Sequence, residues 1–400
     1  MFEDKEEKNA WSVFLIFLKL GLTSFGGPVA HLGYFREEFV NRRRWLSEAR
    51  YADLVSLCQF LPGPASSQVG IAVGLSRSGY PGALAAWLGF TLPSALLMIL
   101  FALGVGVYEN QLPDGMIRGF KVVAVAVVAQ AVWGMARNLC PDGTRITLMA
   151  IATCIALLAQ SVWGQVGVIM LAGIAGLVLF PHPDHKAEIT KVPSRRRRVA
   201  LLWLMTFFAL LFGLSIAAQL YPNQILALAD SFYRSGSLVF GGGHVVLPLL
   251  EAEVVPSGWV DKEVFLAGYG AAQAVPGPLF TFAAFLGASM GLEPSGWSGG
   301  LICLLAIFLP SFLLVAGALP FWEQLRHNEY TQSALTGVNA GVVGLLLAAL
   351  YDPVWTSAIH QPQDFGLALL AFVALMYWRL TPWLVVVGCT LLSIVVSPWL

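Results

Sequence analysis

Two Pro-Gly-Pro triplets are the residues of this 400-residue chain whose chemistry is easiest to define. Pro62-Gly63-Pro64 and Pro276-Gly277-Pro278 each interrupt a long apolar stretch. Because proline removes a backbone donor and clashes with the preceding turn, neither stretch is expected to form one smooth helix. A helix that restarts at Pro64 or Pro278 would point free N–H groups at the break, where they can bind an oxyanion. A kink that serves packing is the alternative interpretation.

Polar residues flank both triplets. Ser66 and Ser67 follow the first triplet and Thr281 follows the second, and their hydroxyls can donate hydrogen bonds to the same anion. Gln59 and Gln273 each lie three residues before the first proline of a triplet. These amides could bind an oxyanion or satisfy carbonyls that the broken helix leaves free, and both interpretations stay open.

Glycine motifs form a second pair of predicted helix breaks. Gly26-Gly27 closely follows Ser24, and Gly241-Gly242 closely precedes His244. Consecutive glycines give the backbone unusual freedom, so Ser24, the glycine N–H groups and His244 are candidates for contact with a bound anion. His31 and His244 could instead titrate near neutral pH or have a structural role.

Lys19 and Arg234 are the candidate cations. Each lies two residues before a glycine, within or at the edge of an apolar run. A cation at membrane depth is costly unless it meets an anion or snorkels to the headgroups. The repeated position favours substrate binding, and snorkelling is the alternative.

These motifs belong to an internal repeat. The two glycine motifs lie 215 residues apart and the two Pro-Gly-Pro triplets 214 apart, and Pro93-Ser94 is matched in the same order by Pro310-Ser311. We therefore divide the chain into an N-terminal repeat, residues 11–180, and a C-terminal repeat, residues 229–399. Residues 181–228 are predicted to be a basic linker plus one extra transmembrane helix.

Composition places the chain in a membrane. Hydrophobic residues make up 57% of the chain, charged residues only 12%, and the mean hydropathy is +0.73, whereas soluble domains carry roughly 25% charged residues. Long apolar stretches recur along the whole sequence, which predicts an all-α polytopic membrane protein embedded in a lipid bilayer. The formal net charge is zero, so nothing indicates a nucleic-acid partner.

The charges of two matched loops predict opposite orientations for the repeats. Residues 36–50 contain five arginines, whereas residues 251–263 contain a single Lys/Arg residue, Lys262. The positive-inside rule then places these loops on opposite sides of the membrane. We therefore expect two inverted-topology repeats, with broken or re-entrant helices at the Gly-Gly and Pro-Gly-Pro motifs.

Enzyme chemistry is disfavoured. Residues 287–291 fit the G-x-S-x-G pattern, but they end an apolar segment and lack the strand–turn–helix context of a hydrolase. The sequence contains no HExxH, P-loop or dinucleotide-binding motif, and its five cysteines are scattered. We therefore expect no catalytic residues, no cofactor and no metal site.

Several motifs resemble the chromate ion transporter family in its long two-domain form. FLKLGLTSFGGP (residues 17–28), QFLPGP (59–64) and the following Ser66-Ser67-Gln68 are similar to the family's N-terminal domain. FGGGH (240–244) and QAVPGP (273–278) are similar to its C-terminal domain. The resemblance implies efflux of chromate across the inner (plasma) membrane of bacterial cells, conferring chromate resistance and driven by the membrane potential or the proton gradient.

These inferences combine into a secondary active transporter for chromate or a related oxyanion. The anion would settle between the two Pro-Gly-Pro helix ends, and relative motion of the repeats would expose the site alternately. Sulfate or another inorganic anion is the alternative substrate, and an anion channel is the alternative mechanism. Gly70/Gly74 and Gly337/Gly341 allow close helix contacts, either within the chain or in a homodimer.

Overall fold

The computed structural model describes residues 9–108, 114–159, 161–180, 194–322 and 328–396. Regular structure in these residues is helical throughout, as predicted. The basic residues Lys186 and Lys191 of the expected linker lie outside the described residues.

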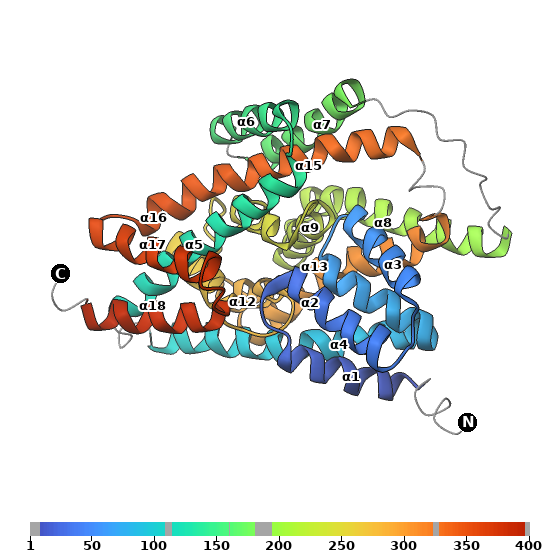
Figure 1. The fold of residues 1–400 in the computed structure, drawn as a ribbon, viewed down its shortest axis with the longest axis horizontal. Helices are drawn as coiled ribbons and strands as arrows, with labels where there is room; N and C mark the ends of the chain where they lie inside the picture. Colours follow the sequence, from blue (N-terminus) through green and yellow to red (C-terminus); the bar gives the residue numbers. More distant parts are fainter. Residues whose placement is uncertain (1–8, 109–113, 160, 181–193, 323–327, 397–400) are drawn as a thin grey trace.

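The N-terminal repeat begins with four short elements and continues with longer helices, of which α4 is the longest (Figure 1). The elements are α1 (Ala10–Thr23), α2 (Gly27–Arg36), the π-helical η2 (Glu37–Arg42), α3 (Glu48–Phe60), α4 (Ala65–Tyr108), α5 (Asp114–Leu139), α6 (Gly143–Leu158) and α7 (Val162–Leu179).

The C-terminal repeat follows the long helix α8 (Ser194–Leu220) and likewise begins with short elements before its long helices. Its elements are α9 (Gln224–Ser237), η4 (Gly243–Val245), α10 (Val246–Val254), α11 (Lys262–Ala272), η5 (Leu279–Thr281), α12 (Phe282–Ala288), α13 (Gly296–Ala318), η6 (Leu319–Phe321), α15 (Glu329–Ala349), η7 (Leu350–Trp355), α16 (Thr356–Ala358), α17 (Pro362–Met376) and α18 (Pro382–Val396).

Helix α4 doubles back on itself. Its backbone leaves the helical region at Ser78 and Gly79, and a Cβ on Gly74 would lie 2.8 Å from the Cβ of Ala86. Residues twelve apart in one straight helix would be about 18 Å apart, so the segments on either side of Ser78 pack as a hairpin. The C-terminal repeat has the matching contact, in which Gly287 of α12 touches the backbone of Gly299 in α13.

A long helix of each repeat packs against helices of the other repeat. Helix α5 packs against α17 and α18 of the C-terminal repeat, whereas α15 packs against α6 and α7 of the N-terminal repeat (Figure 1). Glycines allow the close approach: a Cβ on Gly119 would lie 2.7 Å from Thr390 Cα, and one on Gly337 would lie 2.7 Å from Gly176 Cα. The repeats are therefore interleaved in space, and their sequence boundaries do not separate two bodies.

The glycines considered as a dimer surface make contacts within the chain. Gly70 lies against Phe17, Gly74 against Gly82, and both Gly337 and Gly341 lie against Ala172. Their small size is therefore used for internal helix packing.

Six of the described helices are long and apolar enough to cross a bilayer, and α8 exposes most of its surface. Its side chains Leu202, Met205 and Phe212 are each more than 60% exposed. A continuous apolar surface of this kind is expected to face lipid. The chain is therefore a multi-pass membrane protein. The opposite orientation of the two repeats stays a prediction.

Replacing either glycine of the α7–α15 contact by alanine is expected to destabilise the protein by about 1–3 kcal/mol, because the new methyl group would overlap backbone atoms. The variants are Gly176→Ala and Gly337→Ala, and the measurement is thermal unfolding of the purified protein in detergent.

Gly167→Ala is the matched control on α7, since nothing lies within 4 Å of its added Cβ. This variant should be neutral or up to about 1 kcal/mol more stable. Equal unfolding temperatures for all three variants would contradict the interleaved packing.

Candidate functional site

The four helix breaks meet in pairs, and each pair joins one repeat to the other. The Gly63 N–H donates to the Val239 carbonyl at 2.7 Å, and the Gly277 N–H donates to the Ser24 carbonyl at 2.9 Å. Ser24 and Val239 are matched positions of the repeat, 215 residues apart. The Pro-Gly-Pro triplet of each repeat is thus bonded to the glycine motif of the other, which is the reciprocal pattern of a two-fold relation. We call these two contacts the junctions.

Glycine is required at positions 63 and 277 of the junctions, because the backbone conformation is unfavourable for other residues and a side chain would have little room. Their φ angles are +123° and +99°, which L side chains rarely adopt. A Cβ on Gly63 would lie 3.0 Å from the Ser311 hydroxyl oxygen, and one on Gly277 would lie 2.8 Å from that of Ser94. Ser94 and Ser311 therefore lie at the junctions, and each comes from the repeat opposite to that of the glycine it faces.

Ser94 and Ser311 were not among the candidates predicted from the sequence. The sequence did contain a pattern that could have indicated these serines, because Pro93-Ser94 and Pro310-Ser311 are matched in the repeat. Both serines lie inside long helices, α4 and α13, so nothing local distinguished them from packing residues.

The helices that leave the breaks have free N-terminal donors. Several helices elsewhere begin with a capping side chain, such as Asn9 of α1, Ser47 of α3 or Ser161 of α7, although α11 and α13 have none. By contrast, α2, η4 and η5, which follow three of the breaks, have no side-chain cap. Their orphan N–H groups need a partner, and an anion is a suitable one.

Buried polar atoms without a partner gather on the same segments. Each of these atoms is buried, and none has a hydrogen-bond partner among the residues that the structure describes. Six of the fourteen such atoms lie on the break segments or on α4 and α13 beside them, and they are Ser24 Oγ, His31 Nε2, Ser67 Oγ, Gln68 Oε1, Thr91 Oγ1 and Ser311 Oγ. A buried polar group left without a partner costs roughly 1–3 kcal/mol, so such a concentration indicates a place that water or a polar ligand occupies.

Most of these polar side chains come from the N-terminal repeat. His31 Nδ1 lies 3.4 Å from Ser66 Oγ, and both residues are buried. The matched positions of Ser66 and Gln68 in the C-terminal repeat are Phe280 and Phe282, which are fully buried. The two junctions are alike in backbone but differ in the chemistry of their side chains.

Thr281 is buried, like Ser66 and Ser67, but its hydroxyl is already used. It donates to the Pro278 carbonyl at 2.9 Å, within its own turn. The hydroxyl of Ser67 at the matched position has no such bond, so the N-terminal helix end is the better anion donor.

The two candidate cations lie in different surroundings. Lys19 is exposed on α1. Arg234 is largely buried and forms ion pairs with Asp230 at 2.6 Å and with Glu253 at 2.8 Å. Two carboxylates therefore already offset the charge of Arg234, and neither cation is placed among the junction residues.

The remaining candidates lie at the edges of the site. Gln59 is exposed, whereas Gln273 is half-buried and donates weakly to the Tyr269 carbonyl at 3.5 Å. His244 Nδ1 lies 2.8 Å from the Tyr269 hydroxyl. A Cβ on Gly241 would lie 3.5 Å from Asn339 Oδ1 of α15. Whether any of these residues contacts a substrate stays a prediction.

The arginine-rich loop is partly neutralised by its own acids. Glu38 accepts from Arg43 at 2.6 Å and from Arg42 at 3.0 Å, and Arg36 pairs with Glu48 at 2.7 Å. Burial alone would raise the pKa of Glu38, but the two arginines outweigh it and hold the pKa below its usual value. Among the described residues, no group of three or more His, Cys, Asp or Glu side chains could hold a metal ion.

Comparison with known proteins agrees with these motifs. The profile described as chromate transporter matches residues 11–177 and 226–394, which covers both repeats. A chromate transport protein of Pseudomonas aeruginosa is 28% identical over 92% of this chain and 87% of its own length. A probable chromate transport protein of Synechococcus elongatus is 27% identical over 91% of this chain and 88% of its own.

An uncharacterised transporter of Methanocaldococcus jannaschii is 26% identical over 86% of this chain and 85% of its own length. No solved structure gives a significant match. The family's match occurs twice, over nearly the same two segments that the internal repeat defines, and this settles the assignment: this chain is a member of the chromate transporter family.

Proposed function

We propose that this protein carries chromate, or a similar tetrahedral oxyanion, across the cytoplasmic membrane, and that the anion binds at the junctions. Support for the substrate comes from the relatives named chromate transport proteins. Support for the place comes from one observation above all: buried polar atoms without partners concentrate where the broken helices of the two repeats meet.

A site of this kind binds an anion mainly with neutral donors. The N–H groups at the start of α4 and the hydroxyls of Ser24, Ser67 and Ser311 would supply them. A helix N-terminus carries about half a positive charge. Two broken helices together therefore offset about half of the charge of a dianion without a buried lysine or arginine. This fits the neutralised Arg234 and the exposed Lys19.

The reciprocal junctions suggest how a secondary active transporter would work. Opening one junction while the other stays closed would expose the same anion first to one side and then to the other. The membrane potential favours outward movement of an anion by about 2.3 kcal/mol per charge per 100 mV. Export of a dianion from a cell that is negative inside is thus electrically downhill, and such export would confer resistance to chromate.

The inverted arrangement is part of this proposal. The loop 36–50 would face the cytoplasm and the loop 251–263 the opposite side. Single cysteines at Arg50 and Ser257, which are exposed, in a cysteine-free background should react with an impermeant maleimide from opposite sides of the membrane. Labelling of both positions from one side would contradict the inverted repeats.

Transport of labelled chromate into everted membrane vesicles tests the substrate. Vesicles that contain the protein should accumulate chromate when their interior is made positive, and unlabelled sulfate in excess should reduce this uptake only weakly. Strong sulfate uptake with no chromate uptake would favour the alternative substrate. Flux that does not saturate with chromate concentration would favour the anion channel.

Ser67→Ala should lower the chromate transport rate by about tenfold or more, because a hydrogen bond to a charged group is worth about 1.5–3 kcal/mol. The free energy of unfolding should not fall, since the hydroxyl has no protein partner to lose. Transport in vesicles and unfolding in detergent are both measured.

Ser298→Ala is the control for this variant, because Ser298 is an exposed serine at the start of α13. It should change neither quantity. Unchanged transport in Ser67→Ala would remove this hydroxyl from the site.

A further inference from the structure

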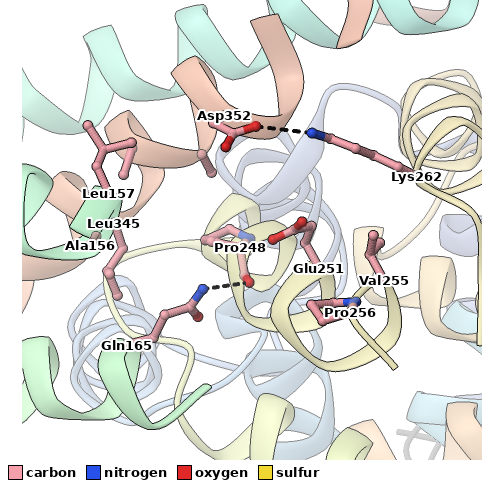
Figure 2. Close-up of a pocket in the computed structure, with 12 residues that line it drawn as sticks. Ala156, Leu157, Gln165, Pro248, Glu251, Val255, Pro256, Lys262, Leu345 and Asp352 are labelled. Atoms are coloured by element: carbon pink, nitrogen blue, oxygen red, sulfur yellow. Dashed lines mark hydrogen bonds and ion pairs between the residues drawn. The ribbon is translucent and has the colours of Figure 1, made fainter. Parts of the chain in front are cut away.

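A cavity of about 170 Å³ lies between the two repeats and contains ionisable groups that the transport site does not use. Its walls come from α6 and α7 of the N-terminal repeat and from α10, α11, α15 and η7 of the C-terminal repeat. Figure 2 shows Glu251 at its centre, with Lys262 and Asp352 on one side and Gln165 on the other.

Glu251 is an acid whose expected partner is bound elsewhere. In the N-terminal repeat the matched residue, Arg36, forms an ion pair with Glu48 at 2.7 Å. The matched residues of the C-terminal repeat are Glu251 and Lys262, so the signs are reversed and an ion pair remains possible. Lys262 instead binds Asp352 at 3.0 Å (Figure 2).

Asp352 has no acidic counterpart in the N-terminal repeat. It lies in η7, just after α15, and the corresponding end of α5, residues 131–139, contains no acid. This additional carboxylate holds the lysine away from Glu251. As a result, the carboxyl group of Glu251 has no hydrogen bond or ion pair with any residue that the structure describes.

The other groups around the cavity do not compensate. Helix α6 contributes only apolar side chains, and α7 contributes the neutral Gln165. Gln165 donates its amide to the Pro248 carbonyl at 2.9 Å, and its buried Oε1 has no partner. Of the neighbouring acids, Glu253 pairs with Arg234 and Glu263 with Lys121.

The charge count favours a proton on Glu251. With this carboxyl ionised, the cavity holds two carboxylates and one ammonium; with it protonated, the cavity is neutral. A protonated carboxyl also becomes a hydrogen-bond donor. Glu251 lies outside the helices long enough to cross a bilayer, and burial raises its pKa to about 7, with Lys262 lowering the pKa and Asp352 raising it.

We propose that Glu251 is a proton-binding site of the transport cycle, which takes up a proton from the side that loop 251–263 faces and releases it as the repeats move. This inference rests on the proposed transport function. Helix α10 carries Glu251 and follows directly on η4, whose Gly243 lies against Pro28 of the N-terminal repeat. Gain or loss of the proton therefore changes the charge on an element that contacts both repeats.

Proton uptake by the purified protein tests the site without any transport. Titration of the protein in detergent, between about pH 6 and about pH 8 on either side of the pKa of about 7, should show about one proton fewer per chain for Glu251→Gln than for the wild type. Glu263→Gln is the matched control, because this acid of the same loop is largely exposed, and it should titrate like the wild type over this range.

The pH profile of chromate transport tests the coupling. Asp352→Asn should free Lys262 to pair with Glu251, lower the pKa of Glu251 and move the midpoint of the profile to lower pH. Lys262→Met should move the midpoint to higher pH. In Glu251→Gln, the step that Glu251 causes in the pH profile should be absent. Chromate itself takes up a proton in this range, but its protonation is the same for every variant, so the quantity compared is the difference in midpoint between each variant and Glu263→Gln.

Equal proton uptake by the wild type and Glu251→Gln would overturn the proposal. If Glu251→Gln does not fold, the test is the opposite shifts of the transport midpoint in Asp352→Asn and Lys262→Met. Unshifted midpoints in both variants would also overturn the proposal. A wild type that takes up the extra proton but carries neither chromate nor sulfate would instead refute the proposed function.

Discussion

The structure depends on one constraint, which is that a helix broken inside a membrane must find partners for the backbone groups that the break releases. This chain breaks four helices, and the breaks satisfy one another across the repeats. Gly63 bonds to Val239 and Gly277 bonds to Ser24. Because each bond joins one repeat to the other, neither repeat can complete its own breaks alone.

The same dependence extends to the long helices. Helix α5 packs on the last two helices of the C-terminal repeat, and α15 packs on the corresponding helices of the N-terminal repeat. Close glycine contacts, such as Gly176 with Gly337, hold this exchange together. A rearrangement at a junction would therefore affect helices of both repeats, which suits a protein whose proposed work needs coordinated movement.

The repeats share a backbone plan and differ in their charges and polar groups. Ser66 beside His31 in one repeat is replaced by Phe280 in the other. The exposed Lys19 corresponds to Arg234, which two acids neutralise. These differences assign separate chemistry to matched places. Most of the buried polar atoms without a partner at the junctions lie in the N-terminal repeat, and Glu251, an acid with no ion pair among the described residues, lies in the C-terminal repeat.

The sequence by itself determined the membrane class, the repeat, the positions of the helix breaks and the family, because hydrophobic length and the effects of proline and glycine are local properties of the chain. Only the tertiary structure decided which break meets which, that Ser94 and Ser311 complete the junctions, and that Arg234 is already paired. Only the tertiary structure revealed that Lys262 pairs with Asp352 and not with Glu251. The junction contacts and the Lys262–Asp352 pair join residues 90 to more than 200 positions apart, and neither spacing nor composition encodes a partner at such a distance. The acids that pair with Arg234 lie only 4 and 19 residues away, but the sequence does not show that both contact it.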